Sequence, residues 1–145
     1  DLIVKNGGAR SIREENPLLI DGQNGNKRTD NDLFMNGPEI FNFTIATIPK
    51  LINSVLHKNN LEIENIDYFI FHQANKFMLD YLRKKIKLDS DKFYNNILYT
   101  GNTVSSTIPI ALKDCLDNNK IKTGDKVLLC GFGVGYSWGA TVITI

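Results

Sequence analysis

Apolar positions recur along the chain in two alternating patterns, one typical of strands and the other of helices. Compact apolar runs predict strands at residues 1–5, 33–35, 67–71, 95–100, 127–130 and 136–145. Apolar residues spaced by three and four predict helices over residues 39–58, from 76 to about 88, and over 103–116. This alternation predicts an α/β fold, with a sheet covered by helices.

Two prolines fall inside predicted helices. Pro49 lies within the first helix, and we expect it to kink or split that helix because it lacks the N–H that the helix needs. Pro109 fits the third helix only if it lies near the first turn. Residues 6–32 are rich in Gly, Asn, Asp and Arg, which predicts a long polar loop with one apolar island at residues 17–20.

Composition and charge exclude several functional classes. The 145 residues, enough for one domain, include 17 basic and 16 acidic side chains and show no basic stripe, so we expect no nucleic-acid binding. Residues 127–145 are uncharged, but their glycines predict two buried strands, and we expect no membrane span. No signal peptide is visible, so a cytoplasmic location is expected. The two cysteines suggest neither a disulfide framework nor a metal site.

Three short segments with chemically useful residues each follow a predicted strand. They are HQAN at 72–75, GNT at 101–103 and GFGVG at 131–135. In α/β sheets, ligand-binding residues lie at the carboxyl ends of strands. Taken alone, His72 would more often be a hydrogen-bonded core residue, Asn102 a turn residue and the glycine string a hairpin.

The order and spacing of these motifs carry a family resemblance. HQAN, then GNTVSSTIPIAL, then GFGVGYSWGA, with MNGPEIFNF upstream at 35–43, resemble the C-terminal half of β-ketoacyl-acyl-carrier-protein synthase III, a thiolase-fold condensing enzyme. The resemblance covers residues 33–145 and leaves 6–32 as a variable polar loop. It implies that residues 1–145 form a C-terminal thiolase-like domain with a mixed sheet. The nucleophilic cysteine would lie in an absent N-terminal half, so this sequence alone is expected to be inactive.

The resemblance also implies an activity and roles for particular residues. The activity is that of an acyltransferase of fatty-acid type biosynthesis, which joins an acyl thioester to malonyl-carrier protein by decarboxylative Claisen condensation. His72 and Asn102 would be catalytic, because two neutral hydrogen-bond donors can stabilise the oxyanion of the malonyl thioester. Phe132, Gly133 and Val134 would form the oxyanion and acyl pocket. Contacts to the pantetheine arm would come from Gly37, Phe41 and Asn75.

Substrates and partners follow from the same resemblance. Coenzyme A or phosphopantetheine thioesters would be substrates, with no permanently bound cofactor. Acyl carrier protein and acyl-coenzyme A would be partners, and the full-length enzyme would be a homodimer. Cys130, one residue ahead of the position that carries the catalytic cysteine in thiolases, is expected to be a packing residue, as is Cys115.

Two departures from the family pattern keep alternatives open. Val134 stands within a usual run of three glycines, and Phe77 stands where an arginine is common. Both favour a related specialised synthase, of secondary metabolism or of surface-polysaccharide acyl chemistry. The chain could instead be a non-catalytic half that pairs with another subunit.

Overall fold

The computed structural model describes residues 2–22 and 25–145, with the backbone alone described for Val134. The chain divides into two compact units, residues 1–42 and 43–145. The helix α1, Gly37–Lys58, begins in the first unit and continues into the second. The assignment of residues 1–145 to one thiolase-like domain stays a prediction.

Two short antiparallel pairs provide the strands of the first unit. β1, Leu2–Ile3, pairs with β4, Phe34–Met35. β2, Ile20–Asp21, pairs with β3, Lys27–Arg28, inside the stretch predicted as a polar loop. The predicted strands at 1–5 and 33–35 are therefore confirmed in shorter form, with Asp1 outside the described residues.

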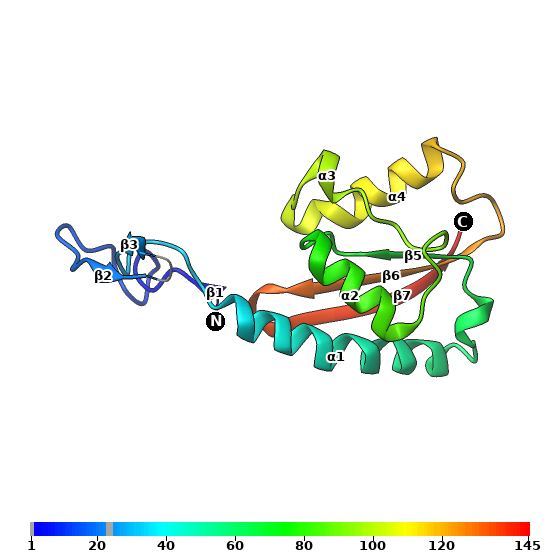
Figure 1. Ribbon diagram of the computed structural model, residues 1–145, viewed down its shortest axis with the longest axis horizontal. Coiled ribbons are helices and arrows are strands. Elements are labelled where there is room, and N and C mark those ends of the chain that lie inside the picture. The colour runs from blue at the N-terminus through cyan, green and yellow to red at the C-terminus, as the bar shows by residue number, and fades with distance from the viewer. Residues whose placement is uncertain (1, 23–24) are drawn as a thin grey trace. The chain divides into compact units, whose positions relative to one another are not determined.

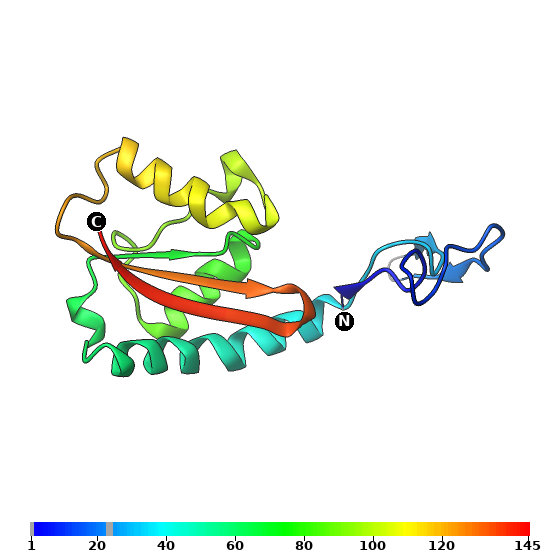
Figure 2. The same ribbon diagram turned by 180° about the vertical axis from the view of Figure 1, so that it is seen from behind.

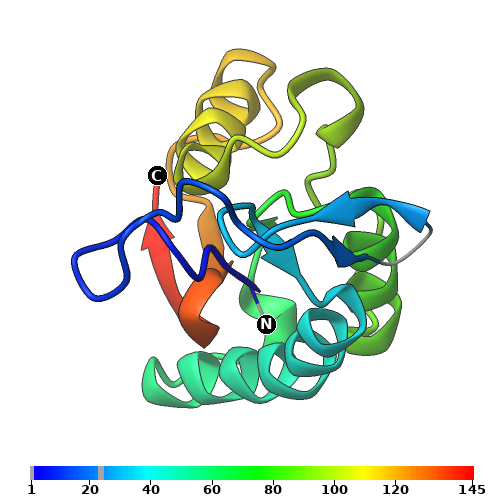
Figure 3. The same cartoon turned by 90° about the vertical axis from the view of Figure 1, so that its left-hand side faces the viewer.

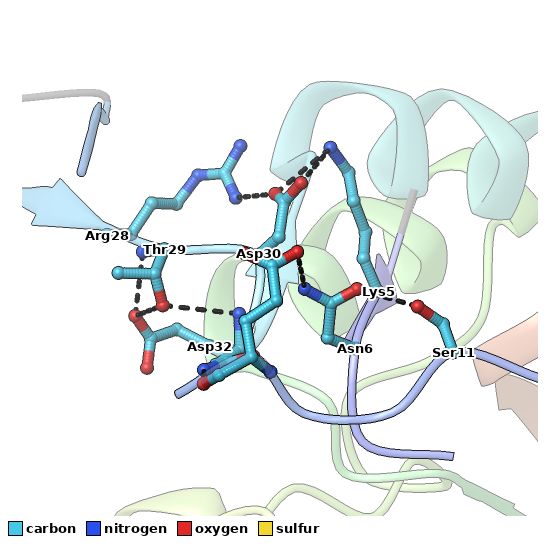
Figure 4. Close-up of polar contacts among 9 residues, drawn as sticks. Lys5, Asn6, Ser11, Arg28, Thr29, Asp30 and Asp32 are labelled. Atoms are coloured by element: carbon cyan, nitrogen blue, oxygen red, sulfur yellow. Dashed lines mark hydrogen bonds and ion pairs between the residues drawn. The ribbon is translucent and has the colours of Figure 1, made fainter. Parts of the chain in front are cut away.

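Polar contacts hold the loop of the first unit (Figure 4). The Asp30 carboxylate forms ion pairs with Lys5 at 3.0 Å and with Arg28 at 3.6 Å. The Asn6 side chain accepts a hydrogen bond from the Ser11 hydroxyl at 2.9 Å. Among the described residues of this unit, no apolar side chain is buried. Since exposed ion pairs each stabilise a fold only slightly, this unit depends on many weak contacts.

The second unit is built on a mixed sheet with the strand order β5-β6-β7 (Figures 1 and 2). β5, Tyr68–Phe71, pairs in parallel with β6, Lys126–Gly133, and β6 pairs antiparallel with β7, Ser137–Thr144. All four residues of β5 are buried, as expected for a continuous apolar run in a parallel pair. The predicted α/β class and the strands at 67–71, 127–130 and 136–145 are confirmed.

Helices cover both faces of this sheet (Figures 1 and 3). α4, Thr107–Asp117, lies on one face, where its Ala111 and Cys115 pack against Tyr68 and Ile70 of β5. α1 and α2, Lys76–Ile86, lie on the other face. A 3₁₀ turn, η2, Ile63–Asn65, leads from α1 towards β5. Because side chains alternate along a strand, β5 contributes to both cores.

The predicted helices are confirmed with small shifts in their bounds. α1 is one helix that continues through Pro49, so the proline does not split it. A 3₁₀ turn, η3, Val104–Ser106, precedes α4, and Pro109 is the third residue of α4. Pro109 therefore lies in the first turn, where its missing N–H removes no helical hydrogen bond.

The predicted strand at 95–100 is wrong, because residues 97–100 form a short helix, α3, Ile97–Thr100. The free edge of β5 is already occupied upstream of this segment. The Phe69 N–H donates to the Lys92 carbonyl at 2.8 Å, and the Tyr94 N–H donates to the Phe69 carbonyl at 3.0 Å. With that edge filled, the segment satisfies its backbone locally, and the Gly101 N–H donates to the Ile97 carbonyl at 2.9 Å.

The start of α2 yields a stability prediction. The Asn75 side-chain oxygen accepts the Met78 N–H at 2.8 Å and so caps the helix. Asn75→Ala removes this acceptor and should lower the free energy of unfolding by about 1 kcal/mol. Asn75→Asp keeps the acceptor and should remain close to the parent. Urea denaturation measures both variants, and equal losses in the two would contradict the capping role.

Candidate active site

The sheet fixes the backbone of His72. The β5–β6 ladder pairs Phe71 with Cys130, and the His72 N–H then donates to the Cys130 carbonyl at 2.8 Å. A tight turn follows, because the Ala74 N–H donates back to the His72 carbonyl at 2.9 Å. The histidine is therefore held at the carboxyl end of β5, where an α/β sheet offers side chains to a ligand.

The His72 ring is held by a hydroxyl and an aromatic ring. Its Nδ1 lies 2.7 Å from the Thr107 Oγ1, at the start of α4. Phe132 of β6 meets the imidazole edge to face, with ring centroids 5.5 Å apart. Burial lowers the pKa of His72 below its usual range, because an apolar setting disfavours the charged form. At neutral pH the ring is therefore uncharged and carries one proton.

Two backbone groups orient the Asn102 amide. The Val104 N–H donates to Asn102 Oδ1 at 2.9 Å, which identifies the other arm of the amide as the NH₂ group. Nδ2 donates to the Ala74 carbonyl at 3.3 Å. An NH₂ group has two protons, and among the described residues Nδ2 has this one acceptor. One N–H of Asn102 is therefore available to a ligand.

Val104 connects the two predicted catalytic residues through its backbone. Its N–H bonds Asn102, while its carbonyl accepts the Thr107 hydroxyl at 3.0 Å. Val104 has a φ of 57°, in the left-handed region that a β-branched residue rarely adopts. Strained backbone of this kind persists where surrounding contacts impose it, often at functional sites.

A cavity of about 420 Å³ opens beside the histidine. Residues of three segments line it, namely the end of β5, the η3–α4 junction and the β6–β7 hairpin. They include His72, Val104, Thr107, Ile108, Phe132 and Trp138. Asn102 is not among the lining residues, and its contact with the site runs through Ala74 and Val104.

The glycine-rich segment predicted to form the acyl pocket joins β6 to β7. Phe132 and Gly133 line the cavity, and a 3₁₀ turn, η4, Val134–Tyr136, closes the hairpin. Gly135 has a φ of 71°, which a residue without a side chain adopts at low cost. The Val134 side chain lies outside the described residues, so its predicted effect on pocket shape stays a prediction.

The predicted pantetheine contacts are distributed over both units. Asn75 is the exposed N-cap of α2 in the second unit. Gly37 and Phe41 lie in the first two turns of α1, in the first unit. Their roles towards the pantetheine arm stay predictions.

Both cysteines are core residues, as expected from the sequence. Neither thiol is exposed to solvent. Burial raises the pKa of Cys130 to about 12 and that of Cys115 to about 11. Since the thiolate is the nucleophile, neither residue has the setting of an acyl-bearing cysteine.

Two residues that support the site through hydrogen bonds, Gln73 and Thr107, were not singled out from the sequence. Gln73 is buried, donates to the Phe71 carbonyl at 2.8 Å and accepts the Asn96 N–H at 3.2 Å, which braces the end of β5. Thr107 is one of several Ser and Thr residues ahead of a helix, and only its fold position selects it. The HQAN motif offered a signal for Gln73, while nothing in the sequence distinguished Thr107.

The described residues were also searched for a metal site and for a membrane-spanning helix. Among residues 2–22 and 25–145, no cluster of three or more His, Cys, Asp or Glu side chains could hold a metal ion. No helix in the described part of the chain is long and apolar enough to cross a lipid bilayer.

Sequence comparison finds relatives along most of the chain. A β-ketoacyl-[acyl-carrier-protein] synthase III of Clostridium novyi is 43% identical over 113 residues, which cover 78% of this chain and 35% of that protein. The corresponding protein of Clostridium perfringens is 36% identical over 145 residues, or 98% of this chain and 45% of that protein. The chain thus spans less than half the length of these curated relatives.

Structural comparison and a family model agree with these relatives. A crystal structure of a 3-oxoacyl-(acyl-carrier-protein) synthase III matches with a TM-score of 0.95 and 42% identity, over 99% of this chain and 43% of that one. The Thermus thermophilus β-ketoacyl-[acyl-carrier-protein] synthase III matches with a TM-score of 0.77 and 33% identity, over 88% of this chain and 41% of that one. The family model for the C-terminal part of 3-oxoacyl-[acyl-carrier-protein] synthase III matches residues 56–145. The chain therefore belongs to the family of C-terminal domains of 3-oxoacyl-[acyl-carrier-protein] synthase III.

Proposed function

We propose that this chain is the malonyl-binding half of a β-ketoacyl-[acyl-carrier-protein] synthase III, in which His72 and Asn102 hold the malonyl thioester oxygen. When malonyl loses carbon dioxide, negative charge develops on that oxygen. Hydrogen-bond donors that are already aimed at it lower the barrier, since they need no reorganisation during the reaction. The chemistry is a decarboxylative Claisen condensation, the reaction of an acyltransferase of fatty-acid biosynthesis.

The observation that carries the proposal is the oriented amide of Asn102. Its oxygen is occupied by the Val104 N–H, so the NH₂ group must face the other way. An amide held in this manner can offer its second N–H to a ligand as a donor. His72 is connected to the same Val104 through Thr107, which supports a common task for the two side chains.

The cavity supports the same chemistry. Phe132, Ile108 and Trp138 give it apolar walls beside the histidine. An apolar setting strengthens hydrogen bonds to a developing charge and limits proton leakage from a carbanion. We assign Phe132, Gly133 and the Val134 N–H to the acyl pocket and its oxyanion site.

The nucleophile of the proposed reaction comes from elsewhere in the complete enzyme. Cys115 and Cys130 are buried thiols with raised pKa, and the relatives are more than twice as long as this chain. The proposal therefore includes a cysteine-bearing half outside these 145 residues.

Substrates and partners are proposed on the same basis. Acyl-coenzyme A and the phosphopantetheine thioester of acyl carrier protein carry anionic phosphate, and the last turn of α2 is basic at Arg83, Lys84 and Lys85. Gly37, Phe41 and Asn75 would contact the pantetheine arm. The complete enzyme would be a cytoplasmic homodimer without a permanently bound cofactor.

A specialised synthase of the same fold is the second candidate. Phe77, where an arginine is common in the family, is 70% exposed on α2. An apolar side chain in that place would change how a carrier or nucleotide is held, and Val134 would alter the acyl pocket. A chain-length series of acyl donors separates the two candidates.

Removal of the proposed donors should affect malonyl decarboxylation. Asn102→Asp keeps the oxygen that accepts the Val104 N–H but loses the NH₂ group. In the complete enzyme it should lower decarboxylation by about 10²–10³-fold and leave cysteine acylation near the parent rate. His72→Ala should lower decarboxylation by a similar factor.

Release of radioactive carbon dioxide from labelled malonyl thioester measures decarboxylation, and intact mass measures acylation. His57→Ala is the matched control, because His57 is exposed in the last turn of α1 and should leave both rates unchanged. Decarboxylation by Asn102→Asp at the parent rate would overturn the proposed role.

The two cysteines of this chain should resist acylation. With their pKa raised to about 11 and about 12, the thiolate is scarce at neutral pH, and both thiols are buried. Incubation of the folded chain with acetyl-coenzyme A should add no mass, whereas iodoacetamide should label both thiols after denaturation. A stable acetyl group on Cys130 would contradict an external nucleophile.

A further inference from the structure

The cavity beside His72 has a floor made of very small residues. The β6–β7 ladder supplies it by pairing Gly131 with Gly139 and Gly133 with Ser137, and all four residues line the cavity. Residues that pair across a ladder point to the same face of the sheet, as do alternate residues of one strand. The floor is therefore a continuous patch of backbone, and Ser137 carries its largest side chain.

The same face of the sheet carries large side chains towards the other end of the hairpin. Val127 and Leu129 precede Gly131 at alternate positions of β6, and Ile143 of β7 pairs with Val127. Val127 belongs to the core that α4 covers, and Leu129 and Ile143 pack against this core. Between Leu129 and Gly131 the side chains on this face therefore change from large to absent. The cavity begins at that point.

Backbone conformation explains two glycines of the hairpin but not the other two. Gly133 and Gly135 have φ values of 157° and 71°, which residues with a side chain rarely adopt. Gly131 and Gly139 have negative φ and lie within regular strands, where any residue fits. Glycine weakens the interior of a strand, because it has no side chain to pack and more entropy to lose. This pair therefore needs another reason.

Close packing does not explain the pair either. A Cβ added to Gly139 would meet no atom of the described residues within 4 Å, its chain neighbours aside. A Cβ added to Gly131 would lie 3.6 Å from the Ile108 Cδ1, which is an ordinary van der Waals contact. Both positions can therefore hold an alanine without moving a neighbour. The space that the two methyl groups would fill belongs to the cavity.

We propose that Gly131 and Gly139 are specificity-determining residues, which lack side chains so that the reacting end of an acyl thioester fits over them. His72 and Ile108 line the same cavity, so a group bound over the floor lies beside the histidine. Width at this place governs branching at the carbon next to the thioester carbonyl, whereas a longer unbranched chain adds atoms farther away. The identity of the ligand rests on the proposed function.

The stability of this chain tests the structural half of the argument. Gly139→Ala and Gly131→Ala should unfold at the parent urea concentration or above it, because each adds a side chain to regular strand without a clash. Gly8→Ala is the matched control, since Gly8 also has open surroundings and no positive φ but does not line the cavity. A lower urea midpoint for either cavity variant would show that the fold itself requires the glycine, and would overturn the inference.

The donor selectivity of the complete enzyme tests the functional half. Intact mass would follow cysteine acylation by acetyl-, butyryl- and isobutyryl-coenzyme A, of which the last two are isomers that differ in branching. Gly139→Ala should lower the acylation rate constant for isobutyryl relative to acetyl by about 10–100-fold, the discrimination that one methylene gives in an apolar pocket. The rate constant for butyryl should fall much less, and Gly8→Ala should keep the parent ratios.

An equal loss for all three donors would indicate that the glycines admit protein backbone, and would overturn the inference. A parent enzyme that rejects isobutyryl-coenzyme A would overturn it as well. If the selectivity shifts as expected while Asn102→Asp still decarboxylates malonyl thioester at the parent rate, the proposed function fails and the role of the glycine pair stands.

Discussion

The two peptide groups of Val104 constrain the whole candidate site. Its N–H fixes which arm of the Asn102 amide is the donor, and its carbonyl accepts hydrogen bonds from both the backbone N–H and the hydroxyl of Thr107. Through Thr107 the same residue reaches the His72 ring. Val104 is β-branched and has a φ of 57°, which costs about 1–3 kcal/mol of backbone strain. The surrounding hydrogen bonds must offset this strain.

The sheet supplies the other half of this arrangement. Parallel pairing of β5 with β6 carries His72 one residue past the end of β5 and bonds its N–H to Cys130. The antiparallel return of β7 then places Phe132 and Trp138 opposite each other on the cavity side. The network closes on itself at Ala74, whose N–H bonds His72 and whose carbonyl bonds Asn102. In this site, backbone groups hold the Asn102 amide, and the Thr107 hydroxyl and the Phe132 ring hold His72.

Sequence patterns predicted the parts of the fold that depend on local periodicity. The buried run of β5 and the spacing of apolar residues in α1 and α2 are strong signals, and both were confirmed. The prediction of a strand at 95–100 is wrong, because residues 92–94 already form the backbone hydrogen bonds with the edge of β5. Such a long-range competition for hydrogen bonds leaves no trace in the local pattern.

The candidate site was predictable to a similar extent. His72 and Asn102 were found from motifs that sit at strand ends, and the structure joins them through a shared network. Thr107 and the left-handed Val104 were not found, because a Ser- and Thr-rich run predicts a helix start without saying which hydroxyl meets a histidine. The backbone conformation at Val104 determines which hydroxyl meets the histidine. Valine rarely adopts a positive φ, so the sequence gives no sign of this conformation.

A structure of the complete enzyme with a stable malonyl-thioester analogue tests the central claim most directly. The thioester oxygen should lie about 2.7–3.1 Å from both the His72 Nε2 and the Asn102 Nδ2. A thioester oxygen directed away from both nitrogens, with His72 and Asn102 contacting only protein or solvent, would contradict the account.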